Sequence, residues 1–478
     1  MPFLDLGGMT MSGIRIATNK DSSAAVDQET IDTLRAELCG RLLLPTDQGY
    51  DEARRVWNGM IDRRPALIVR CAGVADVIAA VKLAKAHDLV VAVKGGGHNI
   101  AGNAVCQDGL MIDLSTMRSV YVDAQARIAR AEGGATWSDF DAETQAFGLA
   151  TTGGLISSTG VGGLTLGGGI GWLMGSYGLA CDNLLSLDVV TADGERVTAS
   201  AEHNPELFWG LKGGGGNFGV VTSFEFRLFP VAPLFAGMLL HPLDRATEAL
   251  AHFHAFFQDA PDQVGALAGF VTAPDGDPVF ALILVYNGPL EDGERVFQPL
   301  REFGPPILDN LAPTPYRVIQ TLFDAGAPSG LRNYWKSSFL EDLPRDAMQT
   351  LVEQFQKAPS PLCKMFVEFI GGEATRIARD ETAFDHRHSA LNLLILGGWE
   401  LVAADEENIA WTRETWKAMQ PHASKAVYVN YLNQEADEGS ERIKAAYGSE
   451  KFARLAVLKA KYDPGNLFRM NQNVRPAG

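Results

Sequence analysis

The chain has 478 residues, of which 46% are hydrophobic and 21% are charged. These values are typical of a globular protein and exclude wholesale disorder. The 41 Lys and Arg residues stand against 58 Asp and Glu residues, which gives a formal net charge of −17. A nucleic acid or an anionic membrane surface is therefore a poor partner for this chain.

The cysteine content favours a reducing compartment. The five cysteines are odd in number and none forms a C-x-x-C pair; they are Cys39, Cys71, Cys106, Cys181 and Cys363. This usage favours a cytoplasmic protein without a disulfide framework or a structural zinc site. No run of about 18 uninterrupted apolar residues occurs, so we expect no membrane-spanning helix. The first residues lack the basic and apolar regions of a secretory signal, and we treat 1–24 as a tail.

The first predicted elements form a strand–helix–strand unit. An amphipathic helix is expected over 25–40, an apolar strand over 66–70, a helix over 74–87 and a second strand over 89–93. This order predicts a βαβ unit whose second strand runs directly into three glycines and His98.

The later elements change in texture along the chain. Strands are predicted over 110–114, 120–122, 128–131, 187–191, 220–228, 279–285 and 391–396, and helices over 137–147, 205–211 and 450–461. After about Pro230 glycine becomes sparser and prolines punctuate longer helices, so we place one boundary near 235. A second change near 427 divides the chain into segments 25–235, 236–426 and 427–478. The mixture of elements predicts the α+β class.

Glycine is enriched and clustered. The 50 glycines among 478 residues are a larger proportion than the usual value of about 7%. They gather at 95–97, 153–171 and 213–219. Such clusters let a backbone approach a phosphate or a flat ring closely, although three tight turns are the simpler alternative. Residues 214–219 match G-x-G-x-x-G, but a predicted helix precedes them and a strand follows. Because a dinucleotide-binding Rossmann site needs the reverse order, we reject it here.

Five motifs resemble one enzyme family. Residues 93–99 (VKGGGHN) resemble the first flavin loop of the FAD-linked oxidases of the vanillyl-alcohol-oxidase/p-cresol-methylhydroxylase superfamily. Residues 159–171, with TGVGG and LGGGIG, and residues 208–221 (FWGLKGGGGNFGVV) are similar to its second and third loops. Residues 428–431 (YVNY) and 462–473 (YDPGNLFRMNQN) resemble the tail of the berberine-bridge-enzyme-like branch.

The resemblance implies a two-domain fold. Segment 25–235 would be an FAD-binding domain of the p-cresol-methylhydroxylase (PCMH) type. Segment 236–426 would be a substrate domain built on an antiparallel sheet covered by helices, and 427–478 would return to the FAD domain. Consecutive backbone N–H groups at 95–99 can also form a nest for the pyrophosphate of FAD without a basic patch.

The resemblance also implies how FAD is held. His98 takes the position that is bonded to the flavin 8α-methyl carbon. Many members of this branch have a second bond from a cysteine, but Ile156 occupies that position, so we expect the single-bond, bacterial-type attachment. The cofactor-binding residues implied are Lys94, Gly95, Gly96, Gly97, His98, Asn99, Ser157, Gly160, Gly162, Gly163, Gly169, Val221, Asn471 and Asn473.

Candidate catalytic residues are a glutamate and two tyrosines. Glu368 fits the family's carboxylate before two glycines, on a strand where it would share one face with Phe366 and Ile370. Such apolar neighbours raise the pKa of a carboxylate and suit it to act as a base. Tyr428 and Tyr431 are alternatives for taking or relaying the substrate proton. Glu368 on an exposed edge, and the tyrosines as ordinary packing residues, are the competing interpretations.

We therefore expect an FAD-dependent oxidase that takes a hydride from an alcohol or amine carbon and is reoxidised by O2, acting as a monomer or homodimer. A dehydrogenase with another electron acceptor and a flavoprotein that sequesters a toxic small molecule are the alternatives. The pairs His252/His254 and His386/His388 look like metal ligands, but the first lies on a predicted helix where i and i+2 diverge. No carboxylate cluster completes either pair, so we expect no metal.

Overall fold

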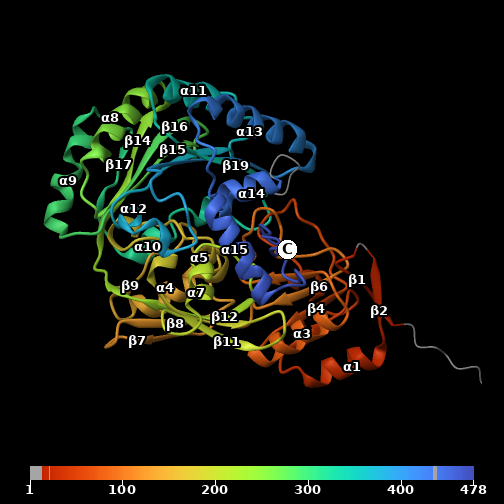
Figure 1. Ribbon diagram of the computed structural model, residues 1–478. Coiled ribbons are helices and arrows are strands. Elements are labelled where there is room, and N and C mark those ends of the chain that lie inside the picture. The colour runs from red at the N-terminus through yellow and green to blue at the C-terminus, as the bar shows by residue number, and fades with distance from the viewer. Residues whose placement is uncertain (1–12, 21, 434–438) are drawn as a thin grey trace, which may run out of the picture.

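The computed structural model describes residues 13–20, 22–433 and 439–478, and it has two halves with a cavity between them (Figure 1). One half carries one mixed sheet and one antiparallel sheet, both built from the first part of the chain. The other half is one large antiparallel sheet with helices on its outer face. This arrangement confirms the predicted α+β class with an antiparallel sheet covered by helices.

The first sheet contains the predicted βαβ unit. Its strands run in the order β3 (Arg41–Leu43), β4 (Leu67–Arg70), β6 (Leu110–Asp113) and β5 (Val91–Lys94). Helix α3 (Val74–Ala86) connects β4 to β5, and β6 lies between these two strands and is parallel to both. Apolar side chains of α1 (Gln28–Glu37), α3 and these strands form one buried core. The carboxyl end of β5 therefore delivers the first glycine loop to the cavity.

The N-terminal stretch corrects one prediction. We expected a tail over 1–24, but β1 (Ile14–Ala17) and β2 (Ser23–Val26) form an antiparallel pair. Ile16 and Val26 are fully buried in the core around α3, because one face of each short strand is apolar. The tail interpretation is thus wrong for these strands, while residues 1–12 and 21 lie outside the described part of the chain.

The second sheet carries the other glycine loops. Its order is β11 (Arg196–Ser200), β10 (Leu184–Val190), β12 (Val220–Arg227), β8 (Ile128–Glu132) and β7 (Val120–Asp123), all antiparallel. Helix α4 (Trp137–Gln145) covers it, and the rings of Trp137, Phe140 and Phe226 contact one another in its core. Helix α7 (Pro205–Leu211) precedes the 213–219 loop and β12 follows it, as predicted, so this loop is not in Rossmann order.

The large sheet forms the opposite half. Its path is β17 (Leu308–Asp309), β14 (Leu234–Pro242), β16 (Pro278–Tyr286), β15 (Val264–Thr272), β20 (Lys364–Phe369), β21 (Leu391–Trp399) and β19 (Arg332–Leu340), with β18 (Ala312–Thr314) also paired to β14. The outer face is covered by α8 (Ala246–Gln258), α9 (Leu290–Glu302), α11 (Arg345–Phe355) and α13 (Asp405–Met419). Residues near Trp172 and helix α10 (Tyr316–Gln320) cover part of the inner face, and side chains of the same face line the cavity.

Shorter elements complete the described chain. They are α2 (Tyr50–Ala53), β9 (Leu149–Ala150), α5 (Val161–Leu166), α6 (Met174–Tyr177), β13 (Phe229–Pro230), α10 (Tyr316–Gln320) and α12 (Glu373–Arg376). Among the described residues, no helix combines the length and the apolar character that crossing a bilayer requires.

The C-terminal helices contact the third glycine loop. Helix α14 (Ser440–Tyr447) places the Tyr447 hydroxyl so that it donates to the carbonyl of Gly214 at 3.2 Å. Helix α15 (Ser449–Tyr462) buries Lys459, whose ammonium donates to the carbonyl of Asn217 at 2.7 Å and binds Asp463 at 2.6 Å. A buried lysine that satisfies a loop carbonyl fixes that loop, so the chain end supports the wall on which the loop lies.

Candidate active site

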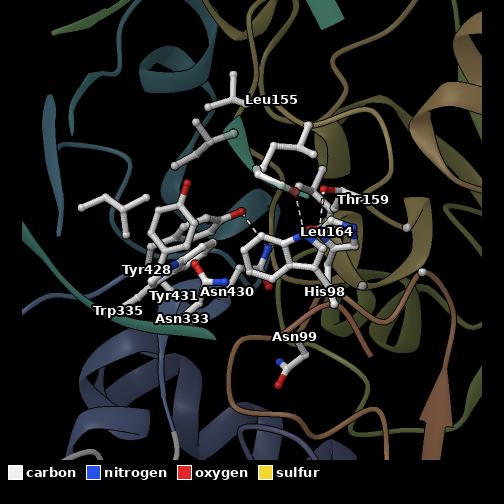
Figure 2. Close-up of a pocket in the computed structure, with 18 of the residues that line it drawn as sticks. His98, Asn99, Leu155, Thr159, Leu164, Asn333, Trp335, Tyr428, Asn430 and Tyr431 are labelled. Carbon is white, nitrogen blue, oxygen red and sulfur yellow. Dashed lines mark hydrogen bonds between the residues drawn. The ribbon is translucent and has the colours of Figure 1, made fainter. Parts of the chain in front are cut away.

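A cavity of about 540 Å³ separates the two halves. Glycine loops that follow β5, precede α5 and precede β12 form one wall. The inner face of the large sheet, together with Tyr428 and Tyr431, forms the other. Figure 2 shows His98 beside Thr159 on one side of this space, and Trp335, Tyr428 and Tyr431 on the other.

The first glycine loop presents free backbone donors to the cavity. Within the described residues, none of the N–H groups of residues 95–99 donates to a protein acceptor. The backbone of this loop also lies close to the backbone of the 157–163 loop, since a Cβ added to Gly96 would lie 2.4 Å from the backbone nitrogen of Gly160. A row of unpaired N–H groups is a binding site for an anion such as a pyrophosphate. The donor set and the size of the cavity therefore fit FAD.

His98 is held between an aromatic ring and two hydroxyls. The Trp57 ring stacks on the imidazole at a centroid distance of 5.2 Å. Ser158 Oγ lies 3.0 Å from Nε2, and Thr159 Oγ1 lies 3.4 Å from Nδ1. Burial lowers the pKa of His98 to about 4, so the imidazole is neutral at neutral pH and keeps a lone pair for bond formation.

Most of the predicted cofactor residues meet at this wall. Those that line the cavity are Gly95, Gly96, Gly97, His98, Asn99, Gly160, Gly162, Gly163, Val221 and Asn471. They come from four separate segments of the sequence, which the two sheets and the C-terminal segment bring together. Asn473 lies outside this lining, and its buried Oδ1 accepts no hydrogen bond from the described residues.

Three predicted cofactor residues have other partners. The ammonium of Lys94 donates to the carbonyl of Ala53 at 2.5 Å and pairs with buried Asp113 at 3.5 Å, while burial lowers its pKa. The Ser157 hydroxyl donates a hydrogen bond to the carboxylate of Asp324, and the Gly169 N–H donates to the Tyr428 hydroxyl at 2.9 Å. These three residues support the loops through contacts within the protein, and their contact with the cofactor stays a prediction.

The sheet wall is mainly apolar. Strand β20 directs Lys364, Phe366 and Glu368 into the cavity, because alternate side chains share a face. The Phe366 ring lies over β15, where a Cβ on Gly269 would come within 2.8 Å of it. Neighbouring strands add apolar side chains to the same face: Met238, Leu240, Leu267, Val271, Ala281, Ile283, Leu394 and Leu396.

Glu368 is the buried acid of this wall. Its side chain is only 1% exposed, so the alternative of a surface glutamate is wrong. The Tyr431 hydroxyl donates to Oε1 and the Asn392 amide donates to Oε2, both at 2.6 Å. Burial raises the pKa of Glu368 to about 7, and the two hydrogen bonds offset part of this rise. The carboxyl group can therefore exchange a proton near neutral pH.

The two tyrosines have different surroundings. Their rings are perpendicular with centroids 4.8 Å apart, and both line the cavity. Burial raises the pKa of each phenol above its usual value. The Tyr428 oxygen accepts hydrogen bonds from the N–H of Gly169 and, at 2.8 Å, from the amide of Asn430. Tyr428 thus holds the second glycine loop, whereas Tyr431 is the tyrosine that contacts the acid.

Other residues in or beside the cavity escaped the sequence analysis. Asn392 pairs with Glu368 across β20 and β21, and this pairing is hidden in the sequence because the two residues are 24 positions apart. Lys364 could have been found from the two-residue alternation that placed Glu368, and its ammonium donates to the carbonyl of Gly326 at 2.6 Å. Trp335, on β19, contacts both Trp57 and Tyr431 through its ring.

The histidine pairs have ordinary partners. His252 lies 2.9 Å from the carbonyl of Pro299, and His254 lies 3.2 Å from the amide of Gln258. His386 lies 2.8 Å from the carbonyl of Ala445. In the part of the chain that the structure describes, no group of three His, Cys, Asp or Glu residues is placed to hold a metal ion.

Comparison with known proteins gives consistent matches. Residues 65–200 match the family model described as FAD binding domain, and residues 427–475 match the model described as berberine and berberine like. An FAD-linked oxidoreductase of Dictyostelium discoideum is 31% identical over 427 residues, covering 88% of this chain and 91% of the relative. (R)-6-hydroxynicotine oxidase of Paenarthrobacter nicotinovorans is 31% identical over 460 residues, covering 92% and 97%. The crystal structure of 6-hydroxy-D-nicotine oxidase from Arthrobacter nicotinovorans superposes with a TM-score of 0.83 at 29% identity, covering 92% of this chain and 98% of that one.

Proposed function

Because the chain belongs to the berberine-bridge-enzyme-like family of FAD-linked oxidoreductases, we propose that it is an oxidase of small alcohols or amines. Its FAD is attached covalently to His98, and O2 is the electron acceptor. The observation that carries this proposal is the Tyr431–Glu368 pair, which shares one cavity with His98 and the free N–H groups of its loop.

The glycine wall holds the cofactor in this proposal. The N–H groups of residues 95–99 bind the pyrophosphate, and the loop at 160–163 receives the remainder of FAD. When bound, FAD accepts the hydride from the substrate carbon. His98, which is neutral and clamped by Trp57, is the side chain placed to form the covalent bond.

The sheet wall moves the proton. Tyr431 accepts the O–H or N–H proton of the substrate, while its own hydroxyl proton passes to Oε1 of Glu368 at 2.6 Å. Asn392 holds the second carboxylate oxygen and so fixes the direction of the first. A base with a pKa near the working pH is effective in such a transfer.

The composition of the sheet wall favours an apolar substrate. The row across the sheet that contains Glu368 continues through Leu267, Ile283 and Met238, all of which line the cavity. A sugar placed on these side chains would lose hydrogen bonds to water without replacing them, which costs free energy. The substrate class proposed is therefore an apolar alcohol or amine.

Two further features belong to the proposal. The five cysteines are free and four of them are buried, which supports a reducing, cytoplasmic location. The switch of sheets at β14 supports the division of the chain into an FAD-binding part to residue 235, a substrate-binding part to 426 and a returning C-terminal segment.

An anaerobic absorbance experiment tests the proposed reaction. Purified flavoprotein is mixed with a panel of aryl alcohols, aryl amines and sugars, and bleaching of the flavin band is followed. We expect bleaching by apolar alcohols or amines and, in air, one hydrogen peroxide for each substrate oxidised. Bleaching without peroxide would indicate a dehydrogenase. Tight binding without bleaching would indicate a sequestering protein.

A further inference from the structure

One segment of the large-sheet half reaches across to the neighbours of His98. Residues 324–331 form the second part of the connection from α10 to β19, and Gly326, Ala327 and Leu331 line the cavity. At one end this segment binds the loop that carries Ser158 and Thr159. At the other end it binds Trp57. Both groups that contact the imidazole are therefore attached to the same segment.

The first attachment runs through Asp324. Its carboxylate accepts two hydrogen bonds from Ser157, one from the backbone N–H at 3.0 Å and one from the hydroxyl at 2.6 Å. Ser157 is 8% exposed. The next two residues in the chain, Ser158 and Thr159, place their hydroxyls at the two nitrogens of His98. A two-point contact to a carboxylate fixes this loop more firmly than a single neutral hydrogen bond.

The second attachment fixes the stacking ring. The indole N–H of Trp57 donates to the carbonyl of Ala327, and the N–H of Gly330 donates to the carbonyl of Trp57, both at 2.9 Å. Trp57 is thus held at both its indole nitrogen and its backbone carbonyl. Figure 2 shows the resulting position of His98 beside Thr159.

From this geometry we propose that Asp324 is a positioning residue for the covalent attachment of FAD to His98. The inference rests on the proposed function, because it presumes the bond to His98. Asp324 acts through Ser157 on the two hydroxyls that orient the imidazole. It belongs to the large-sheet half, so attachment requires that half to be docked on the glycine loops.

The attachment step has a charge requirement that Asp324 meets. A nitrogen of His98 forms a bond to the flavin 8α-methyl carbon, and that methyl group loses a proton. The imidazole then loses its own N–H proton. The two electrons of the broken C–H bond reduce the flavin ring, and O2 removes them as hydrogen peroxide. Positive charge develops on the imidazole as the bond forms, and the Asp324 carboxylate favours that charge against burial.

The test follows attachment in the full-length chain produced without riboflavin. FAD is added, samples are quenched in acid, and the flavin that remains with the precipitated protein is measured over time. Binding of FAD before attachment is measured separately by quenching of protein fluorescence. The variants are Asp324→Asn, which removes the charge, and Ser157→Ala, which removes the hydroxyl contact. The matched control is Asp259→Asn, at an exposed position at the end of α8.

We expect Asp324→Asn to slow attachment by about 10–100-fold, the scale of a small misplacement of reacting groups. Binding of FAD should stay within about threefold of wild type, and Ser157→Ala should slow attachment less. Asp259→Asn should behave as wild type. Attachment at the wild-type rate in Asp324→Asn would overturn the inference, and so would an equal loss of FAD binding, which would make the role structural. If wild type itself forms no acid-stable flavin, the proposed function fails instead.

Discussion

The two walls of the cavity are built on opposite principles. The glycine wall offers backbone: N–H groups at 95–99 that have no acceptor among the described residues, and loops that touch at Gly96 and Gly160 with no room for a side chain. The sheet wall offers side chains: apolar groups of the sheet, with Lys364 and Glu368 among them, and Tyr431 beside Glu368. The two walls therefore suit two different ligands.

This difference explains what each wall does in the proposed reaction. Backbone donors bind phosphate whatever the neighbouring side chains are, so the glycine wall holds the cofactor. Alternating side chains on a sheet determine polarity, shape and proton transfer, so the sheet wall selects the substrate and removes its proton. The two walls should therefore respond differently to mutation, with catalysis lost at one and cofactor binding lost at the other.

The largest effect is expected at the acid–tyrosine pair. Tyr431→Phe removes the hydroxyl that contacts Glu368 at 2.6 Å. Loss of a general base typically slows a reaction by about 10²–10⁴-fold, and we expect flavin reduction to slow by that factor in anaerobic stopped flow. Tyr428→Phe is the matched control, since the Tyr428 hydroxyl accepts hydrogen bonds from Gly169 and Asn430 and, among the described residues, makes none with Glu368. Equal rates in wild type and Tyr431→Phe would contradict the assignment, as would loss of flavin from Tyr431→Phe.

The pH dependence of reduction sharpens the same assignment. Burial raises the pKa of Glu368 to about 7, so below pH 7 the carboxyl group is protonated and cannot accept a further proton. We expect the reduction rate to fall about tenfold for each pH unit below 7 and to level off above it. Glu368→Gln should be slow and should lack this dependence. If the fall in the reduction rate below pH 7 persists unchanged in Glu368→Gln, a group other than Glu368 causes it.

A smaller effect is expected at the glycine wall, and on a different property. Gly96→Ala places a Cβ 2.4 Å from the backbone nitrogen of Gly160, so one loop must shift. Overpacking of this kind costs about 1–3 kcal/mol, and we expect that loss in the free energy of unfolding together with weaker FAD binding. Gly73→Ala is the control, because its Cβ would meet open space and its φ of −170° is extended. If both variants kept wild-type stability and FAD content, close contact of the loops would be unimportant.

The sequence predicted the glycine wall better than the sheet wall. Glycine is required wherever two backbones approach too closely for a side chain to fit between them. Gly95, Gly96 and Gly160 can therefore be recognised from the sequence alone. The direction in which a longer side chain points cannot be recognised from the sequence in the same way. Lys94 belongs to the motif yet turns to Asp113, and Ser157 turns to Asp324.

The sheet wall depends on pairing between distant strands. Alternation along β20 correctly placed Phe366 and Glu368 on the side of the cavity, whereas Ile370 follows the end of the strand and packs in the core of the glycine-loop half. The partner Asn392 comes from β21, and its register with Glu368 is set by the whole sheet. The N-terminal strands were missed for a similar reason, since two short segments become strands only by pairing with each other and packing on α3.

The proposed function depends most on His98 as the single attachment point of FAD. The direct measurement is mass spectrometry of the flavin-bearing peptide released by proteolysis of the purified holoprotein. We predict one flavin peptide that contains His98, with the mass of FAD less two hydrogens added at the imidazole, and no flavin on Cys39, Cys71, Cys106, Cys181 or Cys363. Flavin found on any of these cysteines, or released entirely as free FAD, would contradict the account.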